Sequence, residues 1–257
     1  MGERTTPFVA LTFPRSGSAW LIDTLDSHPR VVAYGELLRR GTDGALGYGA
    51  DDISCFPEYL AARRAGTHGQ AVQRLVYLRT VFRDRPGVGA AGFKLMYGQV
   101  RESPGILQYL ALRRARVVHL VRANLLDAVI SYEVAKTTGV FHPHHGEAVP
   151  LAVVHLDANG LRERLEHMEW SIARARSWLE RYRLPRIDIA YEELVGRGED
   201  TFGRILRFLD VDPDVQALDS SLVRTTTRSP MELVENADDV RAVLIGTRFE
   251  WMLGERQ

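Results

Sequence analysis

The stretch that decides the fold runs from Phe8 to Pro29 and reads FVALTFPRSGSAWLIDTLDSHP. Its apolar first part is closed by Pro14, which predicts a short buried strand. From Trp20 onward, apolar residues recur at helical spacing until the second proline, which predicts a helix. The loop between them, Pro-Arg-Ser-Gly-Ser, occupies the place where α/β proteins hold phosphate groups.

The loop has the residues that an anion site requires. Backbone N–H groups of Ser16, Gly17 and Ser18 can converge on an anion, helped by the dipole of the following helix. Gly17 permits close approach of the backbone, and Arg15 adds a positive charge with a fork of donors. On spacing alone, a plain strand–helix turn with a serine cap is equally open.

The composition sets wide limits on the function. The 257 residues are 45% hydrophobic and 26% charged, which is ordinary for one globular domain spanning residues 1–257. The 33 Lys and Arg residues balance the 33 Asp and Glu residues. A nucleic-acid partner is therefore disfavoured, because it would normally require a basic excess.

The only cysteine is Cys55, so neither an intrachain disulfide nor a cysteine-rich zinc site is expected. No apolar run approaches the roughly 20 residues of a membrane span. The N-terminus is unlike a signal peptide. We expect a soluble, cytoplasmic protein without a membrane span, and a homo-oligomer is possible.

Further short apolar runs predict strands at 31–35, 90–97, 116–121 and 186–194. Helical patterns cover 59–82, 105–114, 124–136 and 161–182. This alternation predicts an α/β protein with a central, mainly parallel sheet flanked by helices.

Four ordered segments resemble one enzyme family. PRSGSAW at residues 14–20 resembles the 5′-phosphosulfate loop of sulfotransferases that use 3′-phosphoadenosine 5′-phosphosulfate (PAPS). VVHLVRANLLDAVISYEVAK resembles their 3′-phosphate site, with Arg122 at a strand end and Ser131 nine residues further on in a helix. YEELV with TFGRILRFLDV, and ELVENADDVRAVLIGTRFEWML, resemble the later segments of bacterial members. The spacing is most similar to bacterial carbohydrate and lipopolysaccharide-type sulfotransferases.

The resemblance implies a P-loop-like nucleotide-binding fold, PAPS as the donor, adenosine 3′,5′-bisphosphate as the product and no metal. It implies an acceptor hydroxyl on a small molecule or saccharide, in a site shaped by variable loops at 41–58 and 137–160. The residues that it assigns to the cofactor are Arg15, Ser16, Gly17, Ser18, Ala19, Trp20, Arg122, Ser131, Tyr191 and Arg228.

Some of these assignments have alternatives. The Arg-Lys-Gly signature that animal members use for the 3′-phosphate is absent, and Arg224, Arg228 and Arg248 could replace it, with Arg228 taken as the candidate. The resemblance places Trp20 and Tyr191 beside the adenine, whereas a plain reading makes both of them core aromatic residues.

Sulfuryl transfer passes in line between two oxygens through a loose transition state, so that positioning and charge stabilisation dominate. The resemblance assigns Arg15 and Lys94 to the bridging and leaving oxygens. Lys94 lies between Phe93 and Leu95 in an apolar strand. Such a position is unusual for a lysine that only extends into solvent.

The resemblance also implies a general base. Glu36 follows the strand VVAYG, as the catalytic Glu of bacterial carbohydrate sulfotransferases follows a comparable stretch. A helix-capping role for it is the alternative. Rival bases are His119, which reads as a core histidine, and His142, His144 and His145, which could line the acceptor pocket. Metal binding by that histidine cluster is disfavoured, because it lacks a carboxylate or cysteine partner at fixed spacing.

Two other classes of protein remain open. A P-loop-like nucleotide kinase would require Gly-x-x-x-x-Gly-Lys-Ser/Thr, but position 12 is Thr12 and no lysine follows Gly17. A non-catalytic nucleotide-binding protein of the same fold would not require both Arg15 and Glu36.

Overall fold

The computed structural model describes residues 4–41, 48–63, 69–103, 105–147, 150, 152–222 and 229–254. One sheet with the order β2-β3-β1-β4-β5 is built from β1 (Thr6–Thr12), β2 (Val31–Tyr34), β3 (Ala90–Met96), β4 (Arg116–Val121) and β5 (Arg186–Ala190). All four neighbouring pairs are parallel. The predicted fold class, an α/β protein with a mainly parallel central sheet, is confirmed.

The helices are α1 (Ser18–Asp26), α2 (Phe56–Ala62), α3 (Gln70–Val81), α4 (Tyr97–Glu102), α5 (Ile106–Leu112), α6 (Leu125–Thr138), α7 (Ala158–Arg181), α8 (Tyr191–Gly196), α9 (Gly198–Phe208) and α10 (Ala237–Leu244). Short 3₁₀ segments are η1 (Val215–Ala217), η2 (Pro230–Leu233) and η3 (Glu250–Leu253). In the described part of the chain, no helix combines the length and the apolar character needed to cross a membrane.

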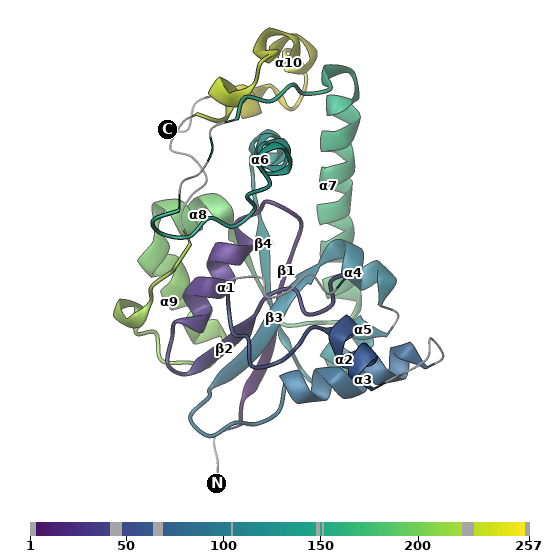
Figure 1. The fold of residues 1–257 in the computed structure, drawn as a ribbon, viewed down its shortest axis with the longest axis vertical. Coiled ribbons are helices and arrows are strands. Elements are labelled where there is room, and N and C mark those ends of the chain that lie inside the picture. Colours follow the sequence, from purple (N-terminus) through teal and green to yellow (C-terminus); the bar gives the residue numbers. More distant parts are fainter. Residues whose placement is uncertain are drawn as a thin grey trace.

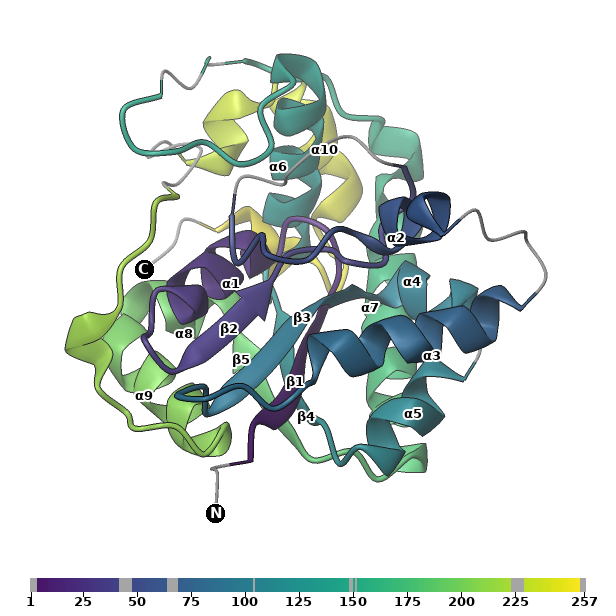
Figure 2. The ribbon, with the colours of Figure 1, turned by 60° about the horizontal axis from the view of Figure 1, so that its bottom comes forward.

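The helices form two layers around the sheet (Figures 1 and 2). α1, α8 and α9 cover one face, and α3, α4, α5 and α7 cover the other, while α6 and α10 lie beyond the carboxyl ends of the strands (Figure 1). With the loop after β1 leading into α1 at that edge, this is the P-loop-like arrangement that the sequence predicted.

β1 lies in the centre of the sheet, which explains its unbroken apolar run. Phe8 and Ala10 pack into the core on the α1 side, whereas Val9 and Leu11 pack into the larger core on the opposite face. Successive side chains of a strand point to opposite faces, and both faces of this sheet are covered. Each of these four central positions of β1 therefore favours an apolar residue.

The helix predicted at 161–182 is present as α7. The carboxylate of Asp157 caps its first turn by accepting from the backbone N–H of Gly160 at 3.2 Å. Most of the predicted apolar stripe faces the core, and its buried members are Leu161, Leu165, Ile172, Ala175 and Leu179. The interpretation as a core-facing amphipathic helix is confirmed.

Two predicted elements were wrong in their extent. The strand predicted at 186–194 ends at Ala190, and α8 begins with Tyr191, because the carboxylate of Glu193 accepts from the N–H of Ala190 at 3.4 Å and starts a helix. The continuous helix predicted at 59–82 is instead α2, ending at Ala62, and α3, beginning at Gln70. Residues 64–68 lie outside the described part.

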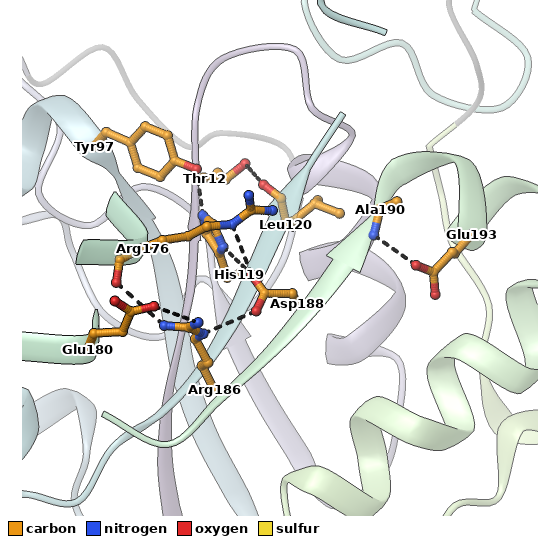
Figure 3. A network of polar contacts seen from close by, with 10 residues as sticks. All are labelled: Thr12, Tyr97, His119, Leu120, Arg176, Glu180, Arg186, Asp188, Ala190 and Glu193. Atoms are coloured by element: carbon orange, nitrogen blue, oxygen red, sulfur yellow. Dashed lines mark hydrogen bonds and ion pairs between the residues drawn. The ribbon is translucent and has the colours of Figure 1, made fainter. Parts of the chain in front are cut away.

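A polar network that runs from the buried His119 and Tyr97 to exposed residues of α7 joins β4 and β5 to α4 and α7 (Figure 3). His119 Nδ1 lies 2.6 Å from Asp188 Oδ1, and its Nε2 lies 2.7 Å from the hydroxyl of Tyr97. Burial lowers the pKa of His119 despite the opposing effect of Asp188, so the ring is neutral at pH 7. The interpretation of His119 as a core histidine is confirmed, because the residue is fully buried.

A carboxylate at the end of α1 makes stability depend on pH. Asp26 Oδ1 accepts from the backbone N–H of Ala33 at 2.8 Å. Burial, with a further contribution from nearby carboxylates, raises the pKa of Asp26 to about 6, although the hydrogen bond from Ala33 opposes the shift. Above pH 6 the folded protein must hold a charge that burial disfavours, and this cost disappears below the usual pKa of an aspartate.

We therefore expect Asp26→Asn, which keeps the acceptor oxygen, to be more stable than wild type at pH 8, by about 1 kcal/mol after allowing for solvent screening. The gain should shrink as pH falls through 6. Urea unfolding at pH 8 and pH 5 measures it, with Asp239→Asn at an exposed position of α10 as the matched control. A gain that is equal at both pH values would contradict the assignment.

Candidate active site

A cavity of about 610 Å³ opens at the carboxyl ends of the strands. It gathers nearly all of the residues that the sequence assigned to catalysis and cofactor binding. Those lining it are Arg15, Gly17, Ser18, Ala19, Trp20, Glu36, Lys94, Arg122, Ser131 and Tyr191. Of the remaining two, Ser16 is fully buried within the loop, and Arg228 is outside the described residues.

The loop between β1 and α1 requires glycine at its last residue, directly before the helix. Gly17 has a φ of 83° and forms the N-cap of α1. A Cβ there would lie 2.3 Å from Cδ2 of Tyr191. Glycine therefore meets both the left-handed backbone and the close packing of the tyrosine ring, and it leaves the amides of the first helical turn directed at the cavity.

Ser16 contributes its backbone rather than its hydroxyl. The side chain is fully buried, and its Oγ donates to the carbonyl of Phe13 at 2.9 Å while also contacting the hydroxyl of Thr12. Thr12 in turn donates to the carbonyl of Leu120 at 2.9 Å. These bonds tie the turn to β4, so the shape of the loop is set before any ligand binds.

Arg15 connects three parts of the site. Its backbone is left-handed, with a φ of 63°, which costs on the order of 1 kcal/mol for a residue with a Cβ. Its Nε donates to Ser131 Oγ at 3.0 Å and its Nη1 to the carbonyl of Phe141 at 2.7 Å. Burial, followed by the positive charge of Arg122, lowers the pKa of Arg15 to about 10. Two cations that repel each other beside a cavity favour an anionic ligand.

Arg122 is held on three sides. Its Nη2 forms a 3.0 Å ion pair with Asp127 Oδ2, and both side chains are 7% exposed. Its Nη1 donates to the carbonyl of Arg15 at 3.3 Å, and its guanidinium lies 4.8 Å from the ring centre of Tyr191. Ser131, which the sequence paired with Arg122, accepts its hydrogen bond from Arg15.

Glu36 and Lys94 meet because of the strand register. Tyr34 of β2 pairs with Phe93 of β3, and the N–H of Lys94 donates to the carbonyl of Gly35 at 3.3 Å. The next residue, Glu36, therefore lies beside the lysine, and its Oε1 is 2.9 Å from Nζ.

The Lys94 side chain is 5% exposed, so it is not an ordinary surface lysine. It points to the α1 face, opposite its apolar neighbours in β3, and Nζ lies 3.3 Å from the hydroxyl of Tyr48. Burial alone would lower the pKa of Lys94, but Tyr48 and the carboxylate of Glu36 outweigh burial and the pKa is raised. The lysine is therefore a firmly held cation.

Two of the loop histidines reach the cavity. His142 and His145 line it, whereas His144 Nδ1 lies 3.2 Å from Ser221 Oγ. The ring of His142 packs edge-on against Tyr48, with centroids 4.7 Å apart. Burial, together with the charges of Lys94 and Arg15, lowers the pKa of His142 to about 3, so it is neutral at physiological pH.

The other residues that the sequence considered for the cofactor differ in where they lie. Trp20 is half-buried and packs edge-to-face on Phe202, with ring centroids 5.9 Å apart, while still lining the cavity. Arg248 lies away from the site, because it pairs with Glu169 of α7 at 2.8 Å. Arg224 and Arg228 lie outside the described residues, so the structure does not choose between them.

Sequence reasoning missed three residues that hold the site together. Asp127 anchors Arg122, Gln99 donates to Glu36 Oε2 at 3.2 Å, and Tyr48 contacts Lys94. Asp127 sits in the first turn of α6, three residues after the N-cap Asn124, where an acidic residue reads as a helix-start signal. Gln99 occupies the third position of α4, where a glutamine also reads as a helix-start signal. Nothing in the sequence pointed to Tyr48.

A second cavity, of about 530 Å³, adjoins the first at Glu36. Tyr48 and neighbours as far as Glu58 line it, together with Asp23 and Asp26 of α1. Glu36 therefore lies at the border of two cavities. One cavity faces the loop after β1, and the other faces the segment before α2.

The fold and the cavity define a P-loop-like α/β protein with a cationic site at the carboxyl edge of its sheet. The family model of the Stf0 sulphotransferases matches residues 62–236. The chain therefore belongs to the Stf0 sulphotransferase family, and the predicted sulfotransferase membership is confirmed. Sulfuryl transfer is the class of reaction that this membership supports.

Individual relatives are distant. Nodulation protein H from Rhizobium tropici is 24% identical over 243 residues, which cover 93% of this chain and 90% of that protein. A sulfotransferase from Alicyclobacillus acidocaldarius is 15% identical with a TM-score of 0.44, covering 99% of this chain and 97% of that one. The sulfotransferase domain from the curacin biosynthetic pathway is 13% identical with a TM-score of 0.45, covering 92% and 83%.

Proposed function

We propose that this protein transfers a sulfuryl group from PAPS to a hydroxyl of a small-molecule or saccharide acceptor, with Glu36 as the general base. The observation that carries the proposal is the convergence of Arg15, Arg122 and Lys94 on one cavity that Glu36 also lines. Three cations suit a donor with phosphate at both ends, and a carboxylate beside them suits removal of a hydroxyl proton.

The donor would be held at two ends. The amides of Ser16, Gly17 and Ser18 suit the 5′-phosphosulfate, because they open a helix at a position where a Cβ could not fit. Arg122 and Ser131 suit the 3′-phosphate, and Trp20 and Tyr191 offer ring faces for the adenine. The lowered pKa of Arg15, to about 10, supports this fit, because a bound dianion would relieve the repulsion from Arg122.

PAPS supplies an activated sulfuryl group whose bond to the 5′-phosphate oxygen breaks as the bond to the acceptor oxygen forms. Glu36 takes the acceptor proton. Lys94 carries three donors, of which Glu36 and Tyr48 use two, so the third can meet charge that develops on the departing oxygen. Arg15 supports the same oxygen from the loop.

The acceptor is expected to reach Glu36 from the side of the described parts of the segments 41–58 and 137–160, within the single domain spanning 1–257; residues 42–47, 148, 149 and 151 lie outside the described part. Phe141, His142 and Pro143 of the second segment line the main cavity, and Tyr48 of the first contacts Lys94. These contacts support an acceptor pocket of partly apolar side chains beside the proposed base.

Calorimetry with adenosine 3′,5′-bisphosphate tests the donor site, and we expect binding with a dissociation constant well below 1 mM. Thermal shifts with the bisphosphate and with ATP–Mg²⁺ then separate a sulfotransferase from a kinase. Transfer of labelled sulfate from PAPS to a panel of phenols, alcohols and saccharides identifies an acceptor. Absence of bisphosphate binding at millimolar concentration would refute the proposal.

A further inference from the structure

Both carboxylate oxygens of Glu36 contact one short segment, which contains the end of β3 and the start of α4. Oε1 lies 2.9 Å from Lys94 Nζ, and Oε2 accepts from Gln99 Nε2 at 3.2 Å. Lys94 is in β3, and Gln99 is in the first turn of α4, which follows that strand without a loop. We call residues 94–99 the β3–α4 corner.

Gln99 has a second bond that fixes the orientation of its amide. Its Oε1 accepts from the backbone N–H of Met96 at 2.9 Å. Because a backbone N–H can only donate, the amide oxygen must face Met96, and the NH₂ group must face Glu36. The side chain is 8% exposed, so water competes little for either bond.

The corner is itself anchored to the sheet. Tyr97, the first residue of α4, meets Nε2 of His119 with its hydroxyl at 2.7 Å, and His119 is held by Asp188 at 2.6 Å (Figure 3). The neighbouring residue of β3, Met96, pairs with Thr12 of β1. The donor of Gln99 is therefore fixed relative to the loop that follows β1.

The backbone of Glu36 makes a turn bond, in which its carbonyl accepts from the N–H of Arg39 at 3.3 Å, but this bond does not orient the side chain. Glu36 lies in the turn after β2, outside any helix or strand, and its side chain is 24% exposed. A glutamate has three side-chain torsions, so contacts must select the rotamer that presents its oxygen to an acceptor. Lys94 alone fixes one oxygen, and Gln99 fixes the plane of the carboxylate.

We propose that Gln99 is a positioning residue for Glu36, and that the β3–α4 corner sets the orientation of the base for sulfuryl transfer. The helix start alone does not explain glutamine, because glutamate caps a helix at this position equally well. Glutamate at 99 would set a second carboxylate against Glu36. The amide donor is the feature that only the neighbouring base requires.

The substitution Gln99→Glu separates the two roles. It keeps an acceptor for the N–H of Met96 but removes the donor to Glu36, whereas Gln99→Met removes both. We expect both variants to lose about 10- to 100-fold in kcat, because a small misplacement of a catalytic group has effects of that size. The KM for PAPS and the affinity for adenosine 3′,5′-bisphosphate should stay within about twofold of wild type.

Gln108→Met is the matched control, since Gln108 is exposed on α5 and donates to the hydroxyl of Tyr182 at 3.1 Å. It should behave as wild type. The assay uses PAPS with whichever acceptor of the panel the wild-type protein sulfates fastest. Wild-type kcat in Gln99→Glu, with lowered stability in Gln99→Met, would show that Gln99 only caps α4 and would overturn the inference.

This inference rests on the proposed function, and Glu36→Gln in the same assay tells the two failures apart. An inactive Glu36→Gln with a fully active Gln99→Glu defeats the role of Gln99 alone. A fully active Glu36→Gln defeats the proposed base. A structure of Gln99→Met with bound bisphosphate adds a readout without turnover, in which an unmoved Glu36 carboxylate would also overturn the inference.

Discussion

Replacing Glu36 by Gln is expected to lower kcat by about 10²- to 10⁴-fold, the usual contribution of a general base. The amide oxygen can still accept from Lys94, which lies 2.9 Å from Glu36 in the wild-type protein, whereas the new NH₂ faces the NH₂ of Gln99 and that hydrogen bond is lost. Affinity for adenosine 3′,5′-bisphosphate should be unchanged, because the phosphate cradle is built from other residues. Single-turnover transfer from labelled PAPS and calorimetry together measure the two quantities.

Two controls make this result specific. Glu102→Gln changes an exposed carboxylate of α4 that pairs with Arg40 at 2.8 Å, and it should leave kcat intact. His142→Gln tests the rival base, since His142 lines the same cavity. Because burial and neighbouring cations lower the pKa of His142 to about 3, it is a poor proton acceptor near pH 7. Loss of turnover in His142→Gln together with an active Glu36→Gln would transfer the role of base to the histidine.

Removing Arg122 is expected to have the largest effect on donor binding. Arg122→Met should weaken adenosine 3′,5′-bisphosphate about 10- to 100-fold, the range for a charge-assisted contact to a phosphate. Adenosine 5′-phosphate, which lacks the 3′-phosphate, should lose much less. An equal loss for both nucleotides in calorimetry would contradict the assignment of Arg122 to the 3′-phosphate.

Arg122→Met is also expected to lower the free energy of unfolding, because Asp127 pairs with Arg122 at 3.0 Å and both side chains are buried. Removing one partner of a buried ion pair while the charge of the other remains costs about 3 kcal/mol or more. The double variant Arg122→Met with Asp127→Asn removes that charge, so it should recover most of the stability lost by the single variant. Its affinity for the bisphosphate should stay low, which separates a binding defect from a folding defect.

Much of the site could be predicted because it lies close to the strands that carry it. Arg15 and Gly17 follow β1, Glu36 follows β2, and Arg122 follows β4. Parallel strands bring their carboxyl ends to one edge, so residues far apart in sequence meet there without any knowledge of side-chain contacts.

The partners of these residues were harder to predict, because they depend on register and on how helices dock. The resemblance assigned Ser131 and Arg122 to one phosphate, and it gave no sign that Arg15 donates to Ser131, since the turn of the loop aims that guanidinium at α6. Glu193 was predicted to lie in a strand and Gln99 was assigned to no element, because a helix that starts directly at a strand end leaves no turn residues in the sequence.

The sequence by itself determined the parallel sheet, the loop between β1 and α1 and the membership of a sulfotransferase family, because these depend on local patterns and ordered motifs. Only the tertiary structure decided that Lys94 pairs with Glu36 and that Gln99 holds the other oxygen. The register of β2 against β3 and the docking of α4 produce that arrangement. Both depend on packing between segments that the linear pattern does not relate.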